Sequence, residues 1–193
     1  MKKYGCLPRD LQPHIKELQQ LLLKDDCFIP SILNTDEGDL AKASKITASS
    51  FKTGYAPESL INGVSRPTDD GENAWYSDGI SVSGEWLCFD LKEKKAVSEV
   101  QLTFDSGFAY PIKITMSDNR KKMQRIGVPP ELVSDFTVEL ISDGKTVLTQ
   151  SVNGNIQRMC RARLTPTECD RIKITFKSTH GCDEIRVFEV RIG

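Results

Sequence analysis

Residues 172–177 read Ile-Lys-Ile-Thr-Phe-Lys and decide the fold class, because apolar and polar side chains alternate strictly along them. Residues 100–104, Val-Gln-Leu-Thr-Phe, repeat this pattern. Successive side chains of a β-strand point to opposite faces, so a period of two predicts strands with one buried and one solvated face. Comparable stretches predict further strands at residues 46–49, 86–91, 112–116, 136–141, 145–152, 157–164 and 185–192.

Short polar turns separate the predicted strands, and Asp143-Gly144 is a residue pair typical of a hairpin. No helical pattern lies between the strands, as parallel pairing would require. The sequence therefore predicts an antiparallel sandwich or barrel. Near the C-terminus, Val187 and Phe188 are both apolar and interrupt the alternation, which a β-bulge would restore.

Residues 118–134 have no clear period and predict a long loop. A basic cluster lies near its start, formed by Arg120, Lys121, Lys122 and Arg125. Such a cluster either binds an anion or the acidic patch of a partner, or is an ordinary solvated loop.

The composition is that of a globular protein with one core, since 38% of the 193 residues are hydrophobic and 27% charged. The 26 basic and 27 acidic residues give a net charge of -1, which argues against nucleic acid or a membrane as partner. No stretch approaches the roughly 18 apolar residues of a membrane span, and the N-terminus lacks the apolar core of a signal peptide. We expect a soluble chain without an export signal, and the compartment of the full-length protein stays open.

Residue types that carry catalytic or metal chemistry are scarce. The six cysteines are irregularly spaced and form no C-x-x-C motif, which favours free thiols over a disulfide framework or a zinc site. His180 has Ser178 and Asp183 nearby in sequence. Catalytic triads are defined by geometry, so this proximity predicts a surface or turn-stabilising role rather than catalysis.

The chain divides into an N-terminal segment, residues 1–43, and a β-rich part, residues 44–193. Apolar side chains recur at helical spacing in the first part, at Leu11, Ile15, Leu18 and Leu22. This stripe predicts a short α-helix at residues 13–24, whose apolar face must pack on the following domain or on a part of the protein outside this chain. Residues 34–44 are interpreted as a linker or surface loop.

Four motifs in a fixed order resemble discoidin domains, the coagulation factor five/eight type C family. They are Ile-Thr-Ala-Ser-Ser at 46–50, Ala-Pro-Glu-Ser-Leu-Ile-Asn-Gly at 56–63, Ala-Trp-Tyr-Ser-Asp at 74–78 and Glu-Trp-Leu-Cys-Phe-Asp-Leu at 85–91. Residues 186–190, Arg-Val-Phe-Glu-Val, resemble the family's final strand. The resemblance implies a mainly β, galactose-binding-like jelly-roll β-sandwich, the fold of many carbohydrate-binding modules.

The N-terminal segment carries a second resemblance. Residues 4–10, Tyr-Gly-Cys-Leu-Pro-Arg-Asp, and 16–22, Lys-Glu-Leu-Gln-Gln-Leu-Leu, resemble the closing segment of bacterial FAD-dependent oxidoreductases, some of which end in a discoidin-like domain. The resemblance implies that the catalytic domain lies outside this chain. No G-x-G-x-x-G motif is present, so FAD is expected only in that parent domain and this chain is expected to be no enzyme.

Sugar recognition needs an exposed aromatic ring beside hydrogen-bonding side chains, because a pyranose has an apolar face surrounded by hydroxyls. Trp75 and Trp86 lie within the motifs and are expected in the core. The candidate ligand-binding residues are therefore loop aromatic and polar residues, Tyr55, Arg66, Asn73, Tyr76, Phe108, Tyr110, Arg120 and His180. These residues could equally cover the end of the sandwich or pack on the missing catalytic domain.

The discoidin resemblance also implies a structural calcium ion, held by loop oxygens and a glutamate of the last strand. Glu189 matches that glutamate, whereas Asn62 stands where the family has Asp and brings no charge. Thr68 and Asp70, in an acidic loop with Asp69 and Glu72, are the expected replacement ligands. The ion would fix the loops and take no part in catalysis.

Three functions follow from these observations. The first is a non-catalytic C-terminal accessory domain of an FAD-dependent oxidoreductase that packs on the catalytic part, binds carbohydrate, or both. The second is a free-standing carbohydrate-binding module. The third, an enzyme in its own right, is disfavoured by the absence of a nucleotide motif and by the scarcity of plausible acid–base groups.

Overall fold

The computed structural model describes residues 34, 36–68, 73–107, 110 and 114–193. They belong to the second of two compact units, Ile32–Gly193. The helix predicted at residues 13–24 and the two stretches that resemble oxidoreductases lie outside the described residues, so the division at residue 43 stays a prediction. Among the described residues, no helix is long and apolar enough to cross a bilayer.

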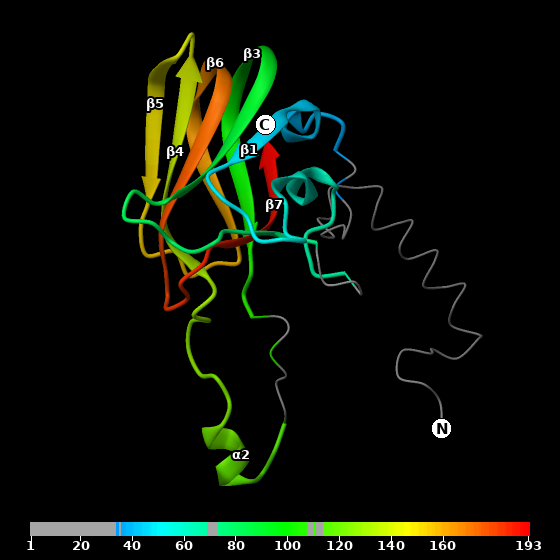
Figure 1. The fold of residues 1–193 in the computed structure, drawn as a ribbon, viewed down its shortest axis with the longest axis vertical. Helices are drawn as coiled ribbons and strands as arrows, with labels where there is room; N and C mark the ends of the chain where they lie inside the picture. The colour runs from blue at the N-terminus through cyan, green and yellow to red at the C-terminus, as the bar shows by residue number, and fades with distance from the viewer. Residues whose placement is uncertain (1–33, 35, 69–72, 108–109, 111–113) are drawn as a thin grey trace, which may run out of the picture. The chain divides into compact units, whose positions relative to one another are not determined.

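The described unit is built almost entirely of antiparallel strands (Figure 1). The strands are β1 (Lys45–Ala48), β2 (Trp75–Tyr76), β3 (Glu85–Phe104), β4 (Val133–Ser142), β5 (Lys145–Val152), β6 (Met159–Thr179) and β7 (Arg186–Ile192). Three short helices accompany them, η1 (Leu40–Ala43), η2 (Pro57–Ile61) and α2 (Asp118–Lys122).

Two long strands, β3 and β6, pair along most of their length, from Glu85 opposite Phe176 to Thr103 opposite Met159. The register shifts twice, between Asp90 and Lys95 and again between Val97 and Glu99. There both strands bend and pass from one sheet into the other, as at the corner of a β-sandwich. The first half of β3 has β1 on its free side and the second half has β7 and then β2, while β4 and β5 extend the sheet beyond β6.

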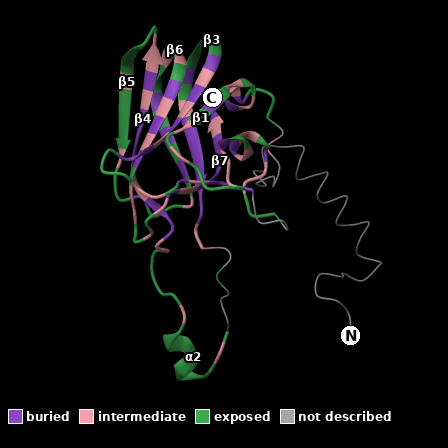
Figure 2. Cartoon of the chain, viewed as in Figure 1, coloured by how far each residue is buried: buried purple, intermediate pink, exposed green. Residues whose placement is uncertain are grey.

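The core lies between the two sheets, as the buried residues of Figure 2 show. The Phe104 ring, from one sheet, meets Phe136 and Phe176 of the other at centroid distances of 5.5 and 6.4 Å. Trp75 packs 5.6 Å from Phe176 and is fully buried, as predicted. Trp86 is only half-buried, because it alternates with the buried Leu87 and faces outward, so its predicted place in the core was wrong.

Two local predictions are confirmed. In the β4–β5 hairpin, Asp143 and Gly144 both adopt positive φ angles, 50° and 76°, which fit the right-handed twist of the strands. In β7, Thr103 pairs with Glu189 but the next residue of β3 pairs with Val187, which leaves Phe188 as the extra residue of a bulge.

Two other predictions need correction. Residues 114–116, predicted as part of a strand, carry no regular structure, and Ile114 and Met116 are exposed side chains of the long segment between β3 and β4. Residues 34–44 are more than a linker, because Ala41 of η1 is fully buried in the core. The Asp39 carboxylate accepts hydrogen bonds from the Ala41 and Ile192 amides at 3.0 Å each and fixes η1 to the end of β7.

The described cysteines are free thiols, which fits the interpretation of the sequence. Cys160 and Cys169 both lie on β6 and pair with Leu102 and Lys95 of β3. Burial raises the pKa of Cys169 to about 11, so this thiol is protonated and unreactive at neutral pH.

The entry into β3 supplies a test of the fold. Gly84 has a φ of +82°, and a Cβ atom there would lie 2.6 Å from the Phe176 carbonyl oxygen. Gly144 has a similar φ of +76° but open space around it. We expect Gly84→Ala to lower the free energy of unfolding by more than about 3 kcal/mol and Gly144→Ala by about 1 kcal/mol in urea titrations. Equal losses would contradict the close approach of the two strands.

Candidate functional site

The strand register brings five connecting segments to one end of the sandwich. Glu85 and Phe104, the two ends of β3, lie there, because β3 bends at its middle and returns. The residues that we call the loop end are 49–56, 77–84, 105–132, 153–158 and 180–185. The described residues of 106–130, which we call the arm, project from the sandwich and carry α2 at their far end (Figure 1).

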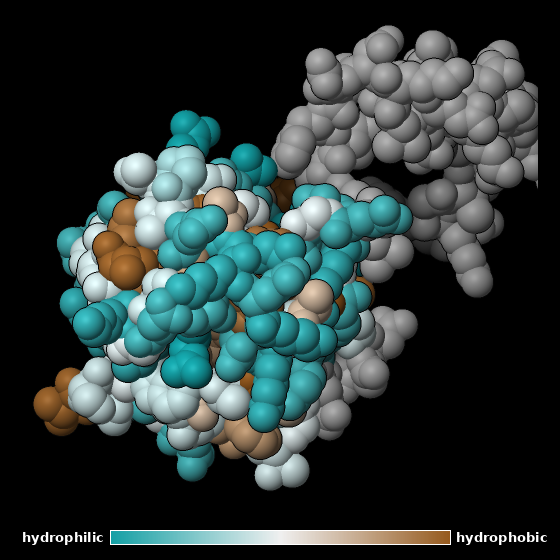
Figure 3. Space-filling model, turned by 90° about the horizontal axis from the view of Figure 1, so that it is seen from above, coloured by the Kyte–Doolittle hydropathy of each residue, from teal (hydrophilic) through white to brown (hydrophobic). Residues whose placement is uncertain are grey.

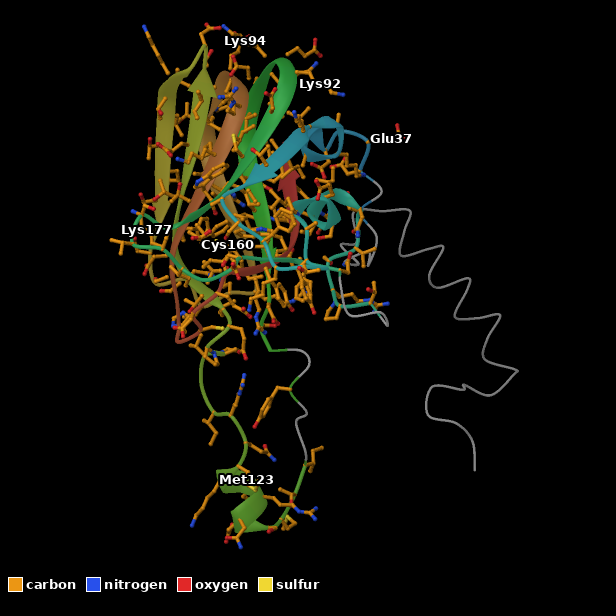
Figure 4. All side chains as sticks on the ribbon, in the orientation of Figure 1. Glu37, Lys92, Lys94, Met123, Cys160 and Lys177 are labelled. Carbon is orange, nitrogen blue, oxygen red and sulfur yellow. The ribbon has the colours of Figure 1, made fainter. Side chains whose placement is uncertain are left out.

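The loop end differs from the opposite end in its surface chemistry. Seen from above in Figure 3, the opposite end is mainly hydrophilic. Figure 4 places Lys92 and Lys94 there and Met123 at the far end of the arm. Apart from Val147 on β5, the exposed large apolar side chains of the described residues lie at the loop end or at the adjoining start of β6, and are Phe51, Val82, Tyr110, Ile114, Met116, Met123, Ile126, Val128, Ile156 and Met159.

Two of the predicted aromatic residues lie together. The rings of Tyr55 and Tyr76 stack with centroids 4.0 Å apart and planes at 6°. The Arg186 guanidinium carbon lies 4.9 Å from the Tyr76 ring centroid. Burial, with the charge of Asp105 adding to it, raises the pKa of Tyr76 to about 12. The Tyr76 ring is therefore partly covered by Tyr55 and Arg186.

An ion-pair network fixes this stack to the sandwich. Arg186 contacts the carboxylates of Glu184 and Asp105 at 2.6 and 3.2 Å, and Lys52 also pairs with Glu184. Burial alone would raise the pKa of Glu184, but the hydrogen bonds from Lys52 and Arg186 keep it below its usual value. The residue pattern did not reveal this network, because its members come from three separate segments of the chain.

A small hollow of about 170 Å³ lies at the base of the arm. It is lined by Ser106, Gly107, Tyr110, Gln124, Arg125, Gly127 and Pro129. Gly107 has a φ of +73° and its amide donates to the Asp105 carboxylate at 2.8 Å, which turns the chain into the arm. The Gly107 carbonyl accepts from the Tyr110 amide at 2.8 Å and places the Tyr110 ring, 38% exposed, at the hollow.

The polar groups of the hollow are held in place by an ion pair. The Arg125 guanidinium carbon lies 4.2 Å from the Tyr110 ring centroid, and its Nη1 donates to Glu131 Oε1 at 2.5 Å. Glu131 Oε2 is buried and has no hydrogen-bond partner among the described residues. That oxygen would lie 3.6 Å from a Cβ atom on Gly107, so it faces the turn that lines the hollow. Glu131 was not selected from the sequence as a site residue, because nothing in the sequence distinguishes a glutamate that follows two prolines.

Other predicted residues have structural roles. Asn73 is 6% exposed, and its Nδ2 donates to the carbonyls of Val64 and Arg66 at 2.8 Å each. His180 is held with Nε2 2.7 Å from the Asn155 carbonyl oxygen. Ser178 donates to Asp135 and not to His180, so these side chains form no triad.

The remaining described candidates do not line the hollow. Arg66 is exposed in the loop that Asn73 holds, and Arg120 is exposed on α2 at the far end of the arm. Phe108 and Asp70 lie outside the described residues. Thr68 is exposed in the same loop as Arg66.

The described residues do not fit a calcium site. Asn62 Oδ1 accepts a hydrogen bond from the Val64 amide at 2.8 Å, and its Nδ2 donates to Asn73, so the side chain already closes its own turn. Glu189 is 2% exposed and neither of its oxygens accepts a hydrogen bond within the described ranges, but Arg191 Nη2 lies 3.1 Å from Oε2. No group of three or more His, Cys, Asp or Glu side chains suited to a metal occurs in that part of the chain.

Comparison with solved structures identifies the fold. No family model and no curated protein matches the sequence. A fucose-binding module of Streptococcus pneumoniae is similar with a TM-score of 0.59 and 16% identity over 82% of this chain and 98% of that one. The lectin domain of lectinolysin, complexed with Lewis B antigen, is similar with a TM-score of 0.60 and 18% identity over 82% of this chain and 98% of that one. A family 32 carbohydrate-binding module of C. perfringens NanJ, in complex with galactose, is similar with a TM-score of 0.53 and 16% identity over 80% of this chain and 96% of that one.

These similarities show that the chain has the galactose-binding-like jelly-roll fold, as the discoidin resemblance implied. They extend over the sandwich and say nothing about the segment that resembles oxidoreductases. That resemblance, and the parent enzyme it implies, stay predictions.

The assigned role of Asn73 can be tested by stability. Asn73→Ala removes hydrogen bonds to two loop carbonyls and to Asn62, so we expect the free energy of unfolding to fall by about 2–3 kcal/mol in urea titrations. Arg66→Ala, in the same loop but exposed, is expected to change it by less than about 0.5 kcal/mol. If Asn73→Ala is as stable as Arg66→Ala, the side chain is free for a ligand and the structural role is wrong.

Proposed function

We propose that this chain is a carbohydrate-binding module whose hollow at the base of the arm holds one neutral sugar residue. The observation that carries the proposal is the combination of an exposed Tyr110 ring with the unpartnered oxygen of Glu131. The neighbours that share the fold include modules whose structures hold galactose or Lewis B antigen, which supports this class of ligand.

Tyr110 and Arg125, which line the hollow, and Glu131 beside it each have a part in such binding. The apolar face of a pyranose packs on an aromatic ring, which Tyr110 supplies. Sugar hydroxyls donate to a carboxylate oxygen, and Glu131 Oε2 is a buried acceptor with no donor of its own. Arg125 donates to hydroxyl or ring oxygens while it remains paired with Glu131.

The same groups favour a neutral sugar over an acidic one. A ligand carboxylate beside Glu131 Oε2 would meet a like charge in a partly desolvated place. Arg125 cannot compensate fully, because its charge is already balanced by Glu131. The hollow is also smaller than the roughly 300–1,000 Å³ of ordinary ligand pockets, so one sugar residue enters it and the rest of a glycan stays outside.

A glycan array followed by isothermal titration calorimetry of the best hit tests the proposal. Tyr110→Ala and Glu131→Gln are each expected to weaken binding at least about tenfold, because they remove the ring and the acceptor charge. Tyr55→Ala, an aromatic truncation at the same end of the sandwich, is the matched control and is expected to stay within about twofold. If Tyr55→Ala abolishes binding and Tyr110→Ala does not, the site is at the stack of Tyr55 and Tyr76 instead. If no glycan on the array binds, the proposal is rejected.

The pH dependence of binding is a second test. Burial alone would raise the pKa of Glu131, but the hydrogen bond and charge of Arg125, a backbone hydrogen bond and the charge of Arg186 together hold the pKa below its usual value. Glu131 therefore stays ionised, and affinity is expected to be constant from about pH 7 to pH 5. In Arg125→Met the hydrogen bond and the charge of Arg125 are lost, so the pKa of Glu131 rises and affinity should fall as the pH falls through that range. Lys122→Met on α2 is the control, and a flat profile for Arg125→Met would contradict the role of Glu131.

The accessory role beside an FAD-dependent oxidoreductase is a second candidate. It is supported by the sequence resemblance of residues 4–10 and 16–22, and by the exposed apolar side chains of the arm, which suit a protein surface. An antibody against the sandwich would then capture, from the source cells, a polypeptide much larger than this chain that carries flavin fluorescence. Capture of a chain of this size without flavin would leave the free-standing module as the function.

A further inference from the structure

Arg158 lies where two segments distant in sequence meet. It precedes β6, and its carbonyl accepts from the Phe104 amide at 2.8 Å, which fixes its backbone against β3. Its Nη2 donates to the Ser65 carbonyl, in the loop that Asn62 and Asn73 shape. The guanidinium carbon lies 6.0 Å from the ring centroid of Phe188, the bulge residue of β7. One half-buried side chain thus joins the loop to the last strand.

The carboxylate of the residue after Phe188 is incompletely compensated. Glu189 follows the bulge, is 2% exposed, and has no hydrogen-bond donor on either oxygen within the described part of the chain. Arg191 Nη2, 3.1 Å from Oε2, supplies an ion pair without hydrogen-bond alignment. Burial lowers the pKa of Arg158, and the negative charges of Asp105 and Glu189 oppose that effect. Glu189 directly follows Phe188, whose ring lies 6.0 Å from the Arg158 guanidinium carbon.

We propose that Arg158 takes the place of the structural cation in this domain: it joins the Ser65 loop to the last strand at Phe188 and supplies positive charge near the buried Glu189, without calcium. A loop carbonyl and a last-strand carboxylate are the two kinds of ligand that the discoidin resemblance assigns to the ion. Here the Ser65 carbonyl already accepts from Arg158, and Asn62 Oδ1 accepts from a backbone amide. A divalent ion at this place would also face the positive charges of Arg158 and Arg191.

Thermal melting with calcium chloride or EDTA tests the proposal on the wild-type chain. We expect the two melting temperatures to agree within about 1 °C, since a ligand that binds the folded state must raise the melting temperature. A calcium-dependent rise of more than about 3 °C, reversed by EDTA, would overturn it. This comparison needs no variant and decides the question even if a substitution prevents folding.

Substitutions test the part played by Arg158. Arg158→Met is expected to lower the melting temperature by about 4 °C or more, because it leaves Glu189 with less compensating charge and frees the Ser65 carbonyl. Arg163→Met, an exposed arginine on the same strand, is the matched control and should change it by less than about 1 °C. In the double variant Arg158→Met/Glu189→Gln, the loss should be smaller than the sum of the two single losses, because the uncompensated charge is gone. Additive losses, or an Arg158→Met variant as stable as its control, would overturn the proposal.

Discussion

The continuous pairing of β3 with β6 is the constraint on which the rest of the structure depends. Because both strands bend and cross between the sheets, their register sets the register of every other strand. The contact of Phe104 with Phe136 and Phe176 then closes the two sheets on each other. A strand that returns on itself brings both of its ends to the same side, which is why the loops at residues 77–84 and 105–132 lie together. The geometry of the site is thus a consequence of the bend.

Much of this fold could be predicted from the alternation of side chains. The period-two pattern at residues 100–104 and 172–177 identified strands, and the consecutive apolar pair Val187-Phe188 identified a bulge. The pattern did not show that each of two pairs of predicted strands is one bent strand, because a register shift leaves no local signal. It failed at residues 114–116, where apolar side chains alternate in a segment without a partner strand.

The site was harder to predict than the fold, and Glu131 illustrates the reason. Aromatic residues in loops can be found from sequence, which is how Tyr55 and Tyr110 were selected. Whether a ring is covered, as Tyr76 is, depends on residues far away in the chain such as Arg186. Likewise, an unpartnered carboxylate oxygen is a property of the folded packing, since nothing in the sequence around Glu131 distinguishes it from a solvated acid. Asn73 shows the converse, because the hydrogen bonds of this polar side chain hold a loop in place and do not face a ligand.

The place where the chain enters and leaves the sandwich has a consequence for how such units can be combined. The Gly193 carbonyl accepts from the amides of Ser98 and Glu99 at 2.7 and 2.8 Å, and Asp39 binds the Ile192 amide, so both ends of the described unit meet where β7 ends. The arm lies at the other end of that strand. Several copies joined in tandem, or one copy fused at either side, would therefore keep every hollow accessible. Weak contacts with single sugars would then add up to avidity on a repeated glycan, with the linker length setting the effective concentration.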